Sequence, residues 1–400
     1  MTFTHRWHRY DKLQTGTLRV EFHPPDRLPN DVAAFWRDTC RANDPASSFL
    51  CGPDWYSMMA RGRGPDSQVA VLRRADGTIR TVAPLLPDTR QVFLALAGRR
   101  LMQATVPVVA VCGGDVVDKD AGLDELDLLF SHILGHYPQV KGVWCDHVTT
   151  GSRTDRLTEL ARSRRGYCFQ TLYTVAQCRL VLPNSIDDLR RLRSRKTISK
   201  IEGRERALRR SHRDECRIVE VRHPEDWSPH AARIETLMNN TWQAKELGMR
   251  FEVGELAELA ARGWLRSFLL MAGDEAAAFA LCYQSGDVFV YARIGYDSKF
   301  AKFSPGTILL YRLLEQLYMS DTPKYVDLGD GDFGYKKELA NDILEANACL
   351  ILRGTAQHAF LLRLYGMARV LNRTGRALLE QANRLGQKFR RLHSGSTAPS

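Results

Sequence analysis

The sequence predicts a mixed α/β protein (α+β in its details) with two similar halves, followed by a basic helical tail. Its 400 residues are enough for two domains that each bury a core. Alternating and helix-spaced apolar segments occur in a similar order in each half, which indicates an internal repeat. Pro183-Asn184-Ser185 interrupts the pattern between the halves. We therefore expect domains at 1–183 and 184–354 and a tail at 355–400.

The first half is expected to contain a β-hairpin followed by alternating strands and helices. Ala75-Asp76-Gly77-Thr78 is a turn sequence between two alternating segments, which predicts the hairpin. Leu123 to His136 has its large apolar residues at helical spacing. The expected order is helices 31–39 and 54–60, strands 68–73, 79–86 and 101–111, helix 123–136, strand 142–147, helix 154–165 and strand 172–182.

The second half is expected to begin with a basic helix and to contain a three-stranded meander. Ser185 precedes two aspartates and can cap a helix that continues to about Arg213. Turn signals at 273–275 and 285–287 separate three strand-like segments. The expected order is strand 218–222, helix 227–247 ending at Gly248, helix 255–262, strands 268–272, 276–284 and 288–294, helix 305–319, strand 325–328, helix 335–340 and strand 348–352.

The net charge of +11 is concentrated in two segments. Residues 190–213 hold eleven Lys or Arg against two Glu, and residues 355–400 hold eight against one. Such segments favour anionic partners, namely a phosphate-bearing cofactor, nucleic acid or an acidic membrane face, although solvated helix faces have the same composition. Because residues 190–213 contain no aromatic side chain for base stacking, nucleic acid is the less favoured partner.

Cysteine usage and hydropathy narrow the class of protein. The nine cysteines include no C-x-x-C pair and no metal-ligand spacing, so we expect reduced thiols and no metal site. No apolar run reaches 18 residues, and the first residues lack the apolar core of a secretory signal. We therefore expect a cytoplasmic protein.

The residues from Lys299 to Thr307 join a predicted strand to a predicted helix. Ser304 stands at a natural N-cap position, Pro305 suits the first helical position, and Gly306 lets a ligand approach the backbone. Free amides at a helix start bind phosphate, and Lys299 and Lys302 add positive charge. Lys302, Ser304, Pro305, Gly306 and Thr307 therefore form a candidate pyrophosphate site, although an ordinary helix start has the same pattern.

A second glycine-rich segment follows the strand at 325–328. Asp327, Asp330 and Asp332 lie among three glycines at the carboxyl end of this strand, where α/β sheets place their sites. A calcium loop is excluded because the ligand positions do not fit. A carboxylate here can accept a proton, and mutual repulsion is expected to raise the pKa of at least one of the three. Turn formation with a helix cap is the alternative interpretation.

Together these segments resemble the CelD-like branch of the GNAT acyltransferase superfamily. The resemblance covers about 189–354 and extends weakly to Ser48-Phe49-Leu50 and Pro53-Asp54-Trp55. It is carried by Arg195-Lys196, Trp242 to Gly248, Phe303-Ser304-Pro305-Gly306-Thr307, Tyr325-Val326-Asp327-Leu328-Gly329 and Gly334-Tyr335-Lys336.

The resemblance implies two tandem GNAT-like folds, related to the Fem peptidyl transferases, with a degenerate first copy. It implies acyl-CoA, acetyl-CoA in the expected case, as the donor. The pantetheine would follow strand 288–294, and the pyrophosphate would meet the amides at Gly306 and Thr307. Only Gly306 of the usual GNAT pyrophosphate loop is present, so a Fem-like tRNA-dependent transferase or a nucleic-acid binder stays a second interpretation.

The resemblance also assigns roles around the donor. Asp327 or Asp330 would act as the base, Tyr335 as the acid for the departing thiolate, and Lys336 as a phosphate or carboxylate ligand. Three residues would bind the acceptor: Trp242, Lys245 and Arg293. The acceptor would be an amine or hydroxyl of a small molecule or glycan, in polysaccharide or envelope metabolism.

The tail has helical spacing from Thr355 to Leu392. Phe360, Met367 and Leu371 alternate with arginines in a pattern typical of a helix that lies on an anionic membrane or docks on a partner. We therefore expect a basic C-terminal helix. One expectation is that this helix associates peripherally with the inner face of the membrane.

Overall fold

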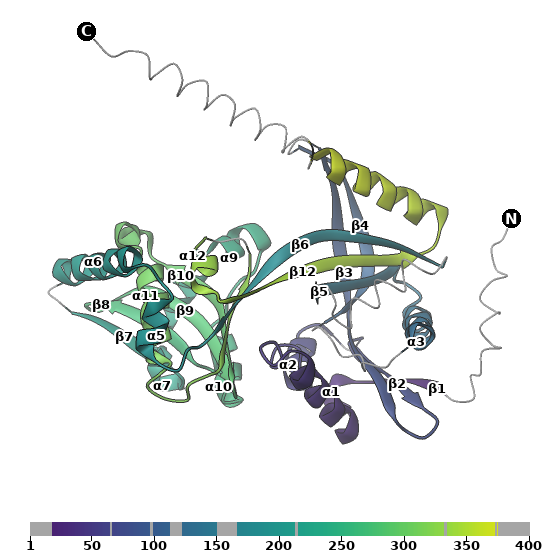
Figure 1. Cartoon of the computed structure of the whole chain (residues 1–400), viewed down its shortest axis with the longest axis horizontal. Coiled ribbons are helices and arrows are strands. Elements are labelled where there is room, and N and C mark those ends of the chain that lie inside the picture. The colour runs from purple at the N-terminus through teal and green to yellow at the C-terminus, as the bar shows by residue number, and fades with distance from the viewer. Residues whose placement is uncertain are drawn as a thin grey trace, which may run out of the picture. The chain divides into compact units, whose positions relative to one another are not determined.

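The protein is described here by a computed structural model that covers residues 18–64, 66–96, 99–112, 122–149, 166–212, 215–331, 334–372 and 374. The chain divides into two compact units (Figure 1). Unit 1 comprises Met1–Thr39, Cys51–Thr174 and Asn347–Ser400, and unit 2 comprises Cys40–Leu50 and Val175–Ala346. The domains expected from the sequence are contiguous, whereas each of these units takes segments from both halves.

Unit 1 contains a sheet with the strand order β1–β2–β3–β4–β5–β12, in which β12 (Asp342–Arg353) belongs to unit 1 from Asn347 onward. Neighbours from β1 to β4 are antiparallel, and β4 and β5 are parallel. Helix α3 supplies its buried apolar face, including Leu126, Phe130 and Ile133, to a core shared with β2 to β5. The elements are β1 (Leu18–His23), η2 (Pro25–Arg27), α1 (Asn30–Asn43), α2 (Pro53–Arg61), β2 (Gln68–Arg74), β3 (Ile79–Leu96), β4 (Arg99–Val111), α3 (Leu123–His136) and β5 (Gly142–Thr149).

Unit 2 contains a sheet with the strand order β6–β11–β10–β9–β8–β7. All neighbours are antiparallel except β10 and β11. The elements are β6 (Tyr167–Val181), α5 (Ile186–Arg191), α6 (Arg195–Ser211), β7 (Cys216–Val221), α7 (Pro224–Trp227), η3 (Ser228–His230), α8 (Ala231–Asn239), α9 (Trp242–Leu247), α10 (Gly254–Ala261), β8 (Ser267–Ala272), β9 (Glu275–Ser285), β10 (Val288–Tyr296), η4 (Ser298–Phe303), α11 (Pro305–Gln316), β11 (Tyr325–Asp330), α12 (Gly334–Leu339) and β12 (Asp342–Arg353).

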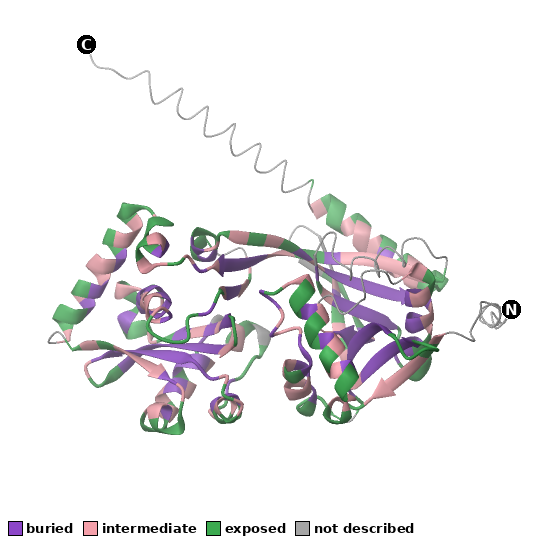
Figure 2. Ribbon diagram, turned by 60° about the horizontal axis from the view of Figure 1, so that its bottom comes forward, coloured by how far each residue is buried: buried purple, intermediate pink, exposed green. Residues whose placement is uncertain are grey.

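Helices cover both faces of the unit 2 sheet. One face carries the main core, in which Ile308 and Leu313 of α11 and Leu208 of α6 pack with apolar residues of β8 to β11. Figure 2 shows the buried strands in purple. On the other face α8 approaches β10 so closely that a Cβ on Gly295 would lie 2.4 Å from the Leu237 carbonyl oxygen.

The predicted internal repeat is confirmed in the order of the elements. The series β2–β3–β4–α3–β5 in the first half corresponds to β8–β9–β10–α11–β11 in the second. The last strand of each half is exchanged, because β6 pairs with β11 and β12 is the neighbour of β5. The predicted mixed α/β class is also confirmed, and residues 356–372 form the expected helix after β12.

Several expected elements differ from the structure. The single basic helix expected from Ser185 to Arg213 is wrong, because Ser194 caps a second helix by accepting a hydrogen bond from the Thr197 amide at 3.1 Å. Strand β1 was not expected, and β11 extends through Asp330 rather than ending at Leu328. The expected helix 154–165 lies outside the described residues. Among the described helices, none is long and apolar enough to cross a membrane.

Candidate functional site

The parallel strands β10 and β11 are paired only at their beginnings. The register joins Val288, Phe289 and Val290 to residues 325–327, and it ends there although β10 continues to Tyr296. We call this point the fork. Beyond it β10 pairs only with β9 on its other side, so one edge of its backbone from Tyr291 to Tyr296 has no strand partner among the described residues.

A bulge bends β10 at the fork. The register with β9 shifts between Tyr291 and Arg293, so that Ala292 is the extra residue. Bulges increase local twist and redirect side chains, and they are frequent beside active sites. The bulge therefore lies where the two strands separate.

The start of α11 contacts the far end of β10. A Cβ on Gly306 would lie 3.2 Å from Ile294 Cδ1 and 3.9 Å from Tyr296 Cδ1. Pro305 occupies the first turn as expected, and the Ser304 carbonyl accepts from the amides of Thr307 and Ile308 at 3.0 and 3.2 Å. The helix start therefore lies directly beside the unpaired segment of β10.

Ser304 stands at the N-cap position, but the expected side-chain cap is absent. Its backbone is left-handed, with φ 54° and ψ 57°, and its side chain makes no capping hydrogen bond. A capping serine needs an extended backbone to direct its hydroxyl at the helix amides. The left-handed turn instead reverses the chain between η4 and α11.

The two lysines before α11 differ in what surrounds them. Lys299 forms an ion pair with Glu275 and lies 3.8 Å from Asp297, so acidic side chains already neutralise its charge. Lys302 is exposed, and its Nζ lies 4.9 Å from the centre of the Phe303 ring. Lys302 is therefore the better placed of the two to meet a phosphate.

Asp327 and Asp330 occupy different surroundings on β11. Asp327 is 3% exposed, and its Oδ1 accepts a hydrogen bond from the Gly329 amide at 2.7 Å. Asp330 is exposed and pairs in register with Gln177 of β6, so the expectation that it lies in a loop is wrong. Asp332 lies outside the described residues.

Asp327 belongs to a row of residues that crosses four strands. The register aligns Tyr283 with Val290, Val290 with Asp327, and Asp327 with Arg179. Aligned residues on neighbouring strands point to the same face. Burial raises the pKa of the Tyr283 hydroxyl, and the nearby charge of Asp327 raises it further. Tyr283 and Arg179 are thus site neighbours that sequence reasoning missed.

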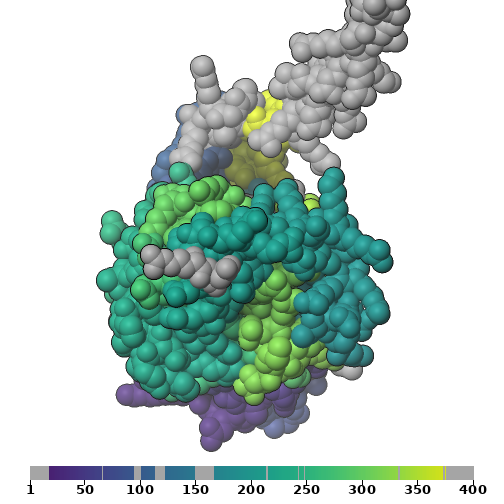
Figure 3. All heavy atoms as spheres, turned by 90° about the vertical axis from the view of Figure 1, so that its left-hand side faces the viewer, coloured from purple at the N-terminus to yellow at the C-terminus, as the bar shows by residue number. Residues whose placement is uncertain are grey.

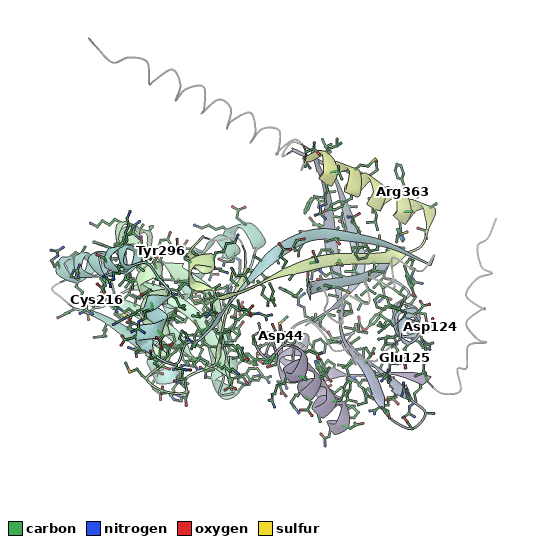
Figure 4. All side chains as sticks on the ribbon, in the orientation of Figure 1. Asp44, Asp124, Glu125, Cys216, Tyr296 and Arg363 are labelled. Carbon is green, nitrogen blue, oxygen red and sulfur yellow. The ribbon has the colours of Figure 1, made fainter. Side chains whose placement is uncertain are left out.

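A segment from the first half covers this face of unit 2. The Arg179 guanidinium donates to both carboxylate oxygens of Asp44 at 2.9 and 2.6 Å, and to Ser47 Oγ at 2.6 Å. Phe49 packs edge-on against Trp264 and Tyr283, with ring centres 5.1 and 6.0 Å apart. Figure 4 labels Asp44. Residues 40–50 are therefore fixed around the row that contains Asp327.

Tyr335 and Lys336 are the second and third residues of α12. The buried Lys336 ammonium donates to the Asp330 carbonyl at 2.8 Å, and burial lowers the pKa of this lysine. A Cβ on Gly329 would lie 3.4 Å from Nζ, so the lysine packs against the carboxyl end of β11. Burial raises the pKa of Tyr335, and this tyrosine interacts electrostatically with Tyr291 at the fork.

The three residues expected to bind the acceptor lie in different settings. Arg293 donates to the Met249 carbonyl at 3.2 Å and to Glu255 at 3.0 Å, which fastens the α9–α10 region to β10. Lys245 is exposed on α9. Trp242 begins α9, and its side chain lies outside the described part of the structure. No group of potential metal ligands occurs among the described residues.

The basic helix α6 presents its charges away from the core. Ile201, Glu205 and Leu208 form its buried face. Figure 3 views unit 2 from the side on which this helix lies at the surface. Several of its cations form no ion pair with any described residue: Arg195, Lys196, Lys200, Arg204, Arg206 and Arg210.

Comparisons with known proteins agree with this geometry. A family model described as the acetyltransferase (GNAT) domain matches residues 195–337. The structure is similar to that of FemX, with a TM-score of 0.54 at 11% identity over 86% of this chain and 100% of the other. It is also similar to a conserved Bacteroides thetaiotaomicron protein of unknown function, with a TM-score of 0.52 at 15% identity over 84% and 100% of the two chains. No curated protein sequence matches. Residues 195–337, which contain the fork and the start of α11, are therefore the part of the chain that is similar to a GNAT acetyltransferase domain.

Proposed function

We propose that this chain transfers an acyl group, acetyl in the first instance, from acyl-CoA to an amine or hydroxyl acceptor. The observation that carries the proposal is the fork, because it leaves one edge of β10 unpaired beside the start of α11. Buried or partly buried backbone amides and carbonyls need partners. A ligand that is itself a chain of amides followed by a pyrophosphate satisfies both the strand edge and the helix start.

The residues present fit such a donor. Pantetheine would pair with the free edge from Tyr291 to Tyr296, and the pyrophosphate would meet the start of α11 at Gly306, whereas the Thr307 amide already donates to the Ser304 carbonyl. Gly306 suits this role, because any larger side chain there fills the space beside Ile294 and Tyr296. The thioester supplies an activated acyl carbon. Lys302 adds positive charge, while Lys299 is already paired with Glu275.

We assign the role of general base to Asp327, with Asp330 as the second candidate. Asp327 is buried at the fork, on the face that residues 40–50 cover, whereas Asp330 is exposed beyond it. A base must lie within hydrogen-bond reach of the proton that it accepts. An acceptor that approaches the donor at the fork would meet Asp327 first.

Tyr335 and Lys336 take different parts. Tyr335 interacts with Tyr291 at the fork, and its hydroxyl, which is protonated at neutral pH, would donate a proton to the departing thiolate. Lys336 donates to the Asp330 carbonyl, and we assign it a positioning role for the turn after β11 in place of the ligand role expected from the sequence.

The acceptor side is proposed from the family resemblance. Trp242 and Lys245 on α9, together with Arg293 on β10, would contact an amine or hydroxyl of a small molecule or glycan. The CelD-like branch, a cytoplasmic location and a place in polysaccharide or envelope metabolism belong to the same proposal.

The donor and the base can be tested separately. Titration calorimetry with acetyl-CoA tests binding, and mass detection of acetylated products from a panel of amines and alcohols tests transfer. Asp327→Asn should lower turnover by about a hundredfold while acetyl-CoA affinity is kept. Asp330→Asn is the matched control in the same strand. A larger loss at Asp330 would move the base along β11, and full turnover in both variants would exclude these carboxylates.

One observation favours a second candidate, an aminoacyl-tRNA-dependent transfer. The six cations of α6 without an ion pair form a surface suited to nucleic-acid phosphates. Likeness to FemX at 11% identity shows the fold alone. If the protein ignores acetyl-CoA but binds tRNA in a salt-dependent way, and Lys196→Gln with Lys200→Gln weakens that binding, the second candidate replaces the first.

A further inference from the structure

The helix formed by residues 356–372 is fixed to unit 1 through one of its faces. Leu362 is buried, and the Tyr365 hydroxyl donates to the Leu172 carbonyl of β6 at 2.9 Å. Arg369 donates to the Thr171 carbonyl. Gly366 allows close approach, because a Cβ there would lie 3.3 Å from Gln170 Oε1. The helix therefore cannot turn its other face inward without losing these contacts.

The opposite face of this helix is apolar and exposed. Phe360 is 64% exposed, Met367 56%, Val370 64% and Leu371 59%. Their spacing of seven, three and one residues places them on one side of a helix. Figure 2 shows the helix mostly in green and pink. We call these four residues the apolar stripe.

The charges along the stripe are positive. Arg363 is exposed about one turn after Phe360 and forms no ion pair with any described residue (Figure 4). Six further Lys or Arg and one Glu follow in residues 373–400. A second copy of the chain placed on the stripe by two-fold symmetry would bring Arg363 of both copies to one interface, which opposes self-association. An anionic surface attracts these positive charges.

We propose that the apolar stripe seats this protein on the surface of an anionic lipid bilayer. Phe360, Met367, Val370 and Leu371 enter the boundary between headgroups and acyl chains, while Arg363 meets lipid phosphates. This combination distinguishes the stripe from α6, which has exposed cations but no exposed large apolar residue within its bounds. The inference does not depend on the proposed acyl transfer.

The experiment is flotation of the full chain with vesicles of phosphatidylglycerol and phosphatidylcholine, compared with phosphatidylcholine alone. We expect binding to the anionic vesicles that weakens as salt is added. Changing the four residues of the stripe together to Gln should weaken binding by about a hundredfold or more, because four apolar side chains lose their burial. Arg363→Gln should weaken binding to the anionic vesicles by about fivefold.

Two control variants separate the stripe from other surfaces. Met249→Gln with Met319→Gln makes the same change at exposed apolar residues elsewhere and should leave binding unchanged. Lys196→Gln, Lys200→Gln and Arg206→Gln remove charge from α6 and should have little effect. Circular dichroism and thermal unfolding confirm that each variant is folded.

Three results would overturn the proposal. The first is that the unaltered chain fails to float with anionic vesicles, which includes the case in which residues 375–400 cover the stripe. The second is that the stripe variant floats as well as the unaltered chain, or that only the α6 variant loses binding. The third is self-association in light scattering that the stripe variant abolishes without any lipid binding, which would make the stripe an interface between copies.

Discussion

Gly306 offers the most direct test of the donor site, because its substitution should separate binding from folding. The change is Gly306→Glu in the first turn of α11. The closest contact of a Cβ at this position is the end of the Ile294 side chain, at 3.2 Å, and that end can shift. A carboxylate in the first turn also suits the helix dipole. We therefore expect the free energy of unfolding to change by no more than about 1 kcal/mol.

The effect on donor binding should be much larger. A glutamate carboxylate about 5 Å from a bound phosphate repels it by about 3 kcal/mol at an effective dielectric constant near 20. That energy corresponds to a loss of affinity of about a hundredfold or more. Steric exclusion from the space beside Tyr296 acts in the same direction.

Titration calorimetry with acetyl-CoA and urea unfolding measure the two quantities on the same protein. Gly254→Glu is the matched control, since Gly254 begins α10 with open space around its Cβ position. Gly306→Ala should fall between the glutamate variant and the unaltered chain. Unchanged acetyl-CoA affinity in Gly306→Glu, or an equal loss in Gly254→Glu, would refute the placement of the donor at α11.

Three further predictions concern packing and charge. Gly142→Ala should lower the free energy of unfolding by about 3 kcal/mol in urea titrations, because the new Cβ would lie 2.1 Å from a carbonyl oxygen of β12. Gly122→Ala is the control, because a Cβ at Gly122 has open space and should change the free energy of unfolding little. Asp44→Ala should cost about 2 kcal/mol in the same assay, since it removes the carboxylate that accepts two hydrogen bonds from the buried Arg179 guanidinium and leaves only the Asp342 carboxylate at 4.0 Å among the described residues. The pKa of Lys336 in the folded chain lies below its ordinary value of 10.5, so the unfolded chain binds this proton more tightly. The free energy of unfolding of the unaltered chain, compared with that of Lys336→Met, should therefore rise as the pH increases toward 10.5. Thermal melts at a series of pH values measure this difference.

Elements whose signals are local could be predicted from the sequence. The helix Leu123–His136 begins and ends where its apolar spacing does. The meander follows from its turn glycines Gly273 and Gly286, which have the positive φ that these turns require, and Gly248 has the positive φ of a helix cap at the end of α9. The start of α11 at Pro305 was predictable because the fixed φ of proline suits the first helical position.

The neighbours of Asp327 could not be predicted, because they depend on strand register. Arg179 lies 148 positions earlier in the chain and Tyr283 lies on another strand, yet the register places both in the row of Asp327. A shift of one residue would turn each side chain to the opposite face. No local pattern around Arg179 or Asp44 distinguishes them from surface charges, so only the folded sheet identifies them.

The strand exchange explains why the candidate site includes residues outside the segment that matches the GNAT domain. Because the two halves repeat the same element order, β6 and β12 are equivalent, and either could fill the place beside β5 or β11. Contacts between residues far apart in the sequence favour the observed arrangement of β6 and β12. Asn341 forms two hydrogen bonds with the Val181 backbone, and the missing side chain of Gly142 leaves room for the backbone of β12. The exchange brings Arg179, and through it Asp44, to the row that holds Asp327. The GNAT match at 195–337 includes neither residue, so part of the wall around the proposed base is supplied by the half of the chain outside that match.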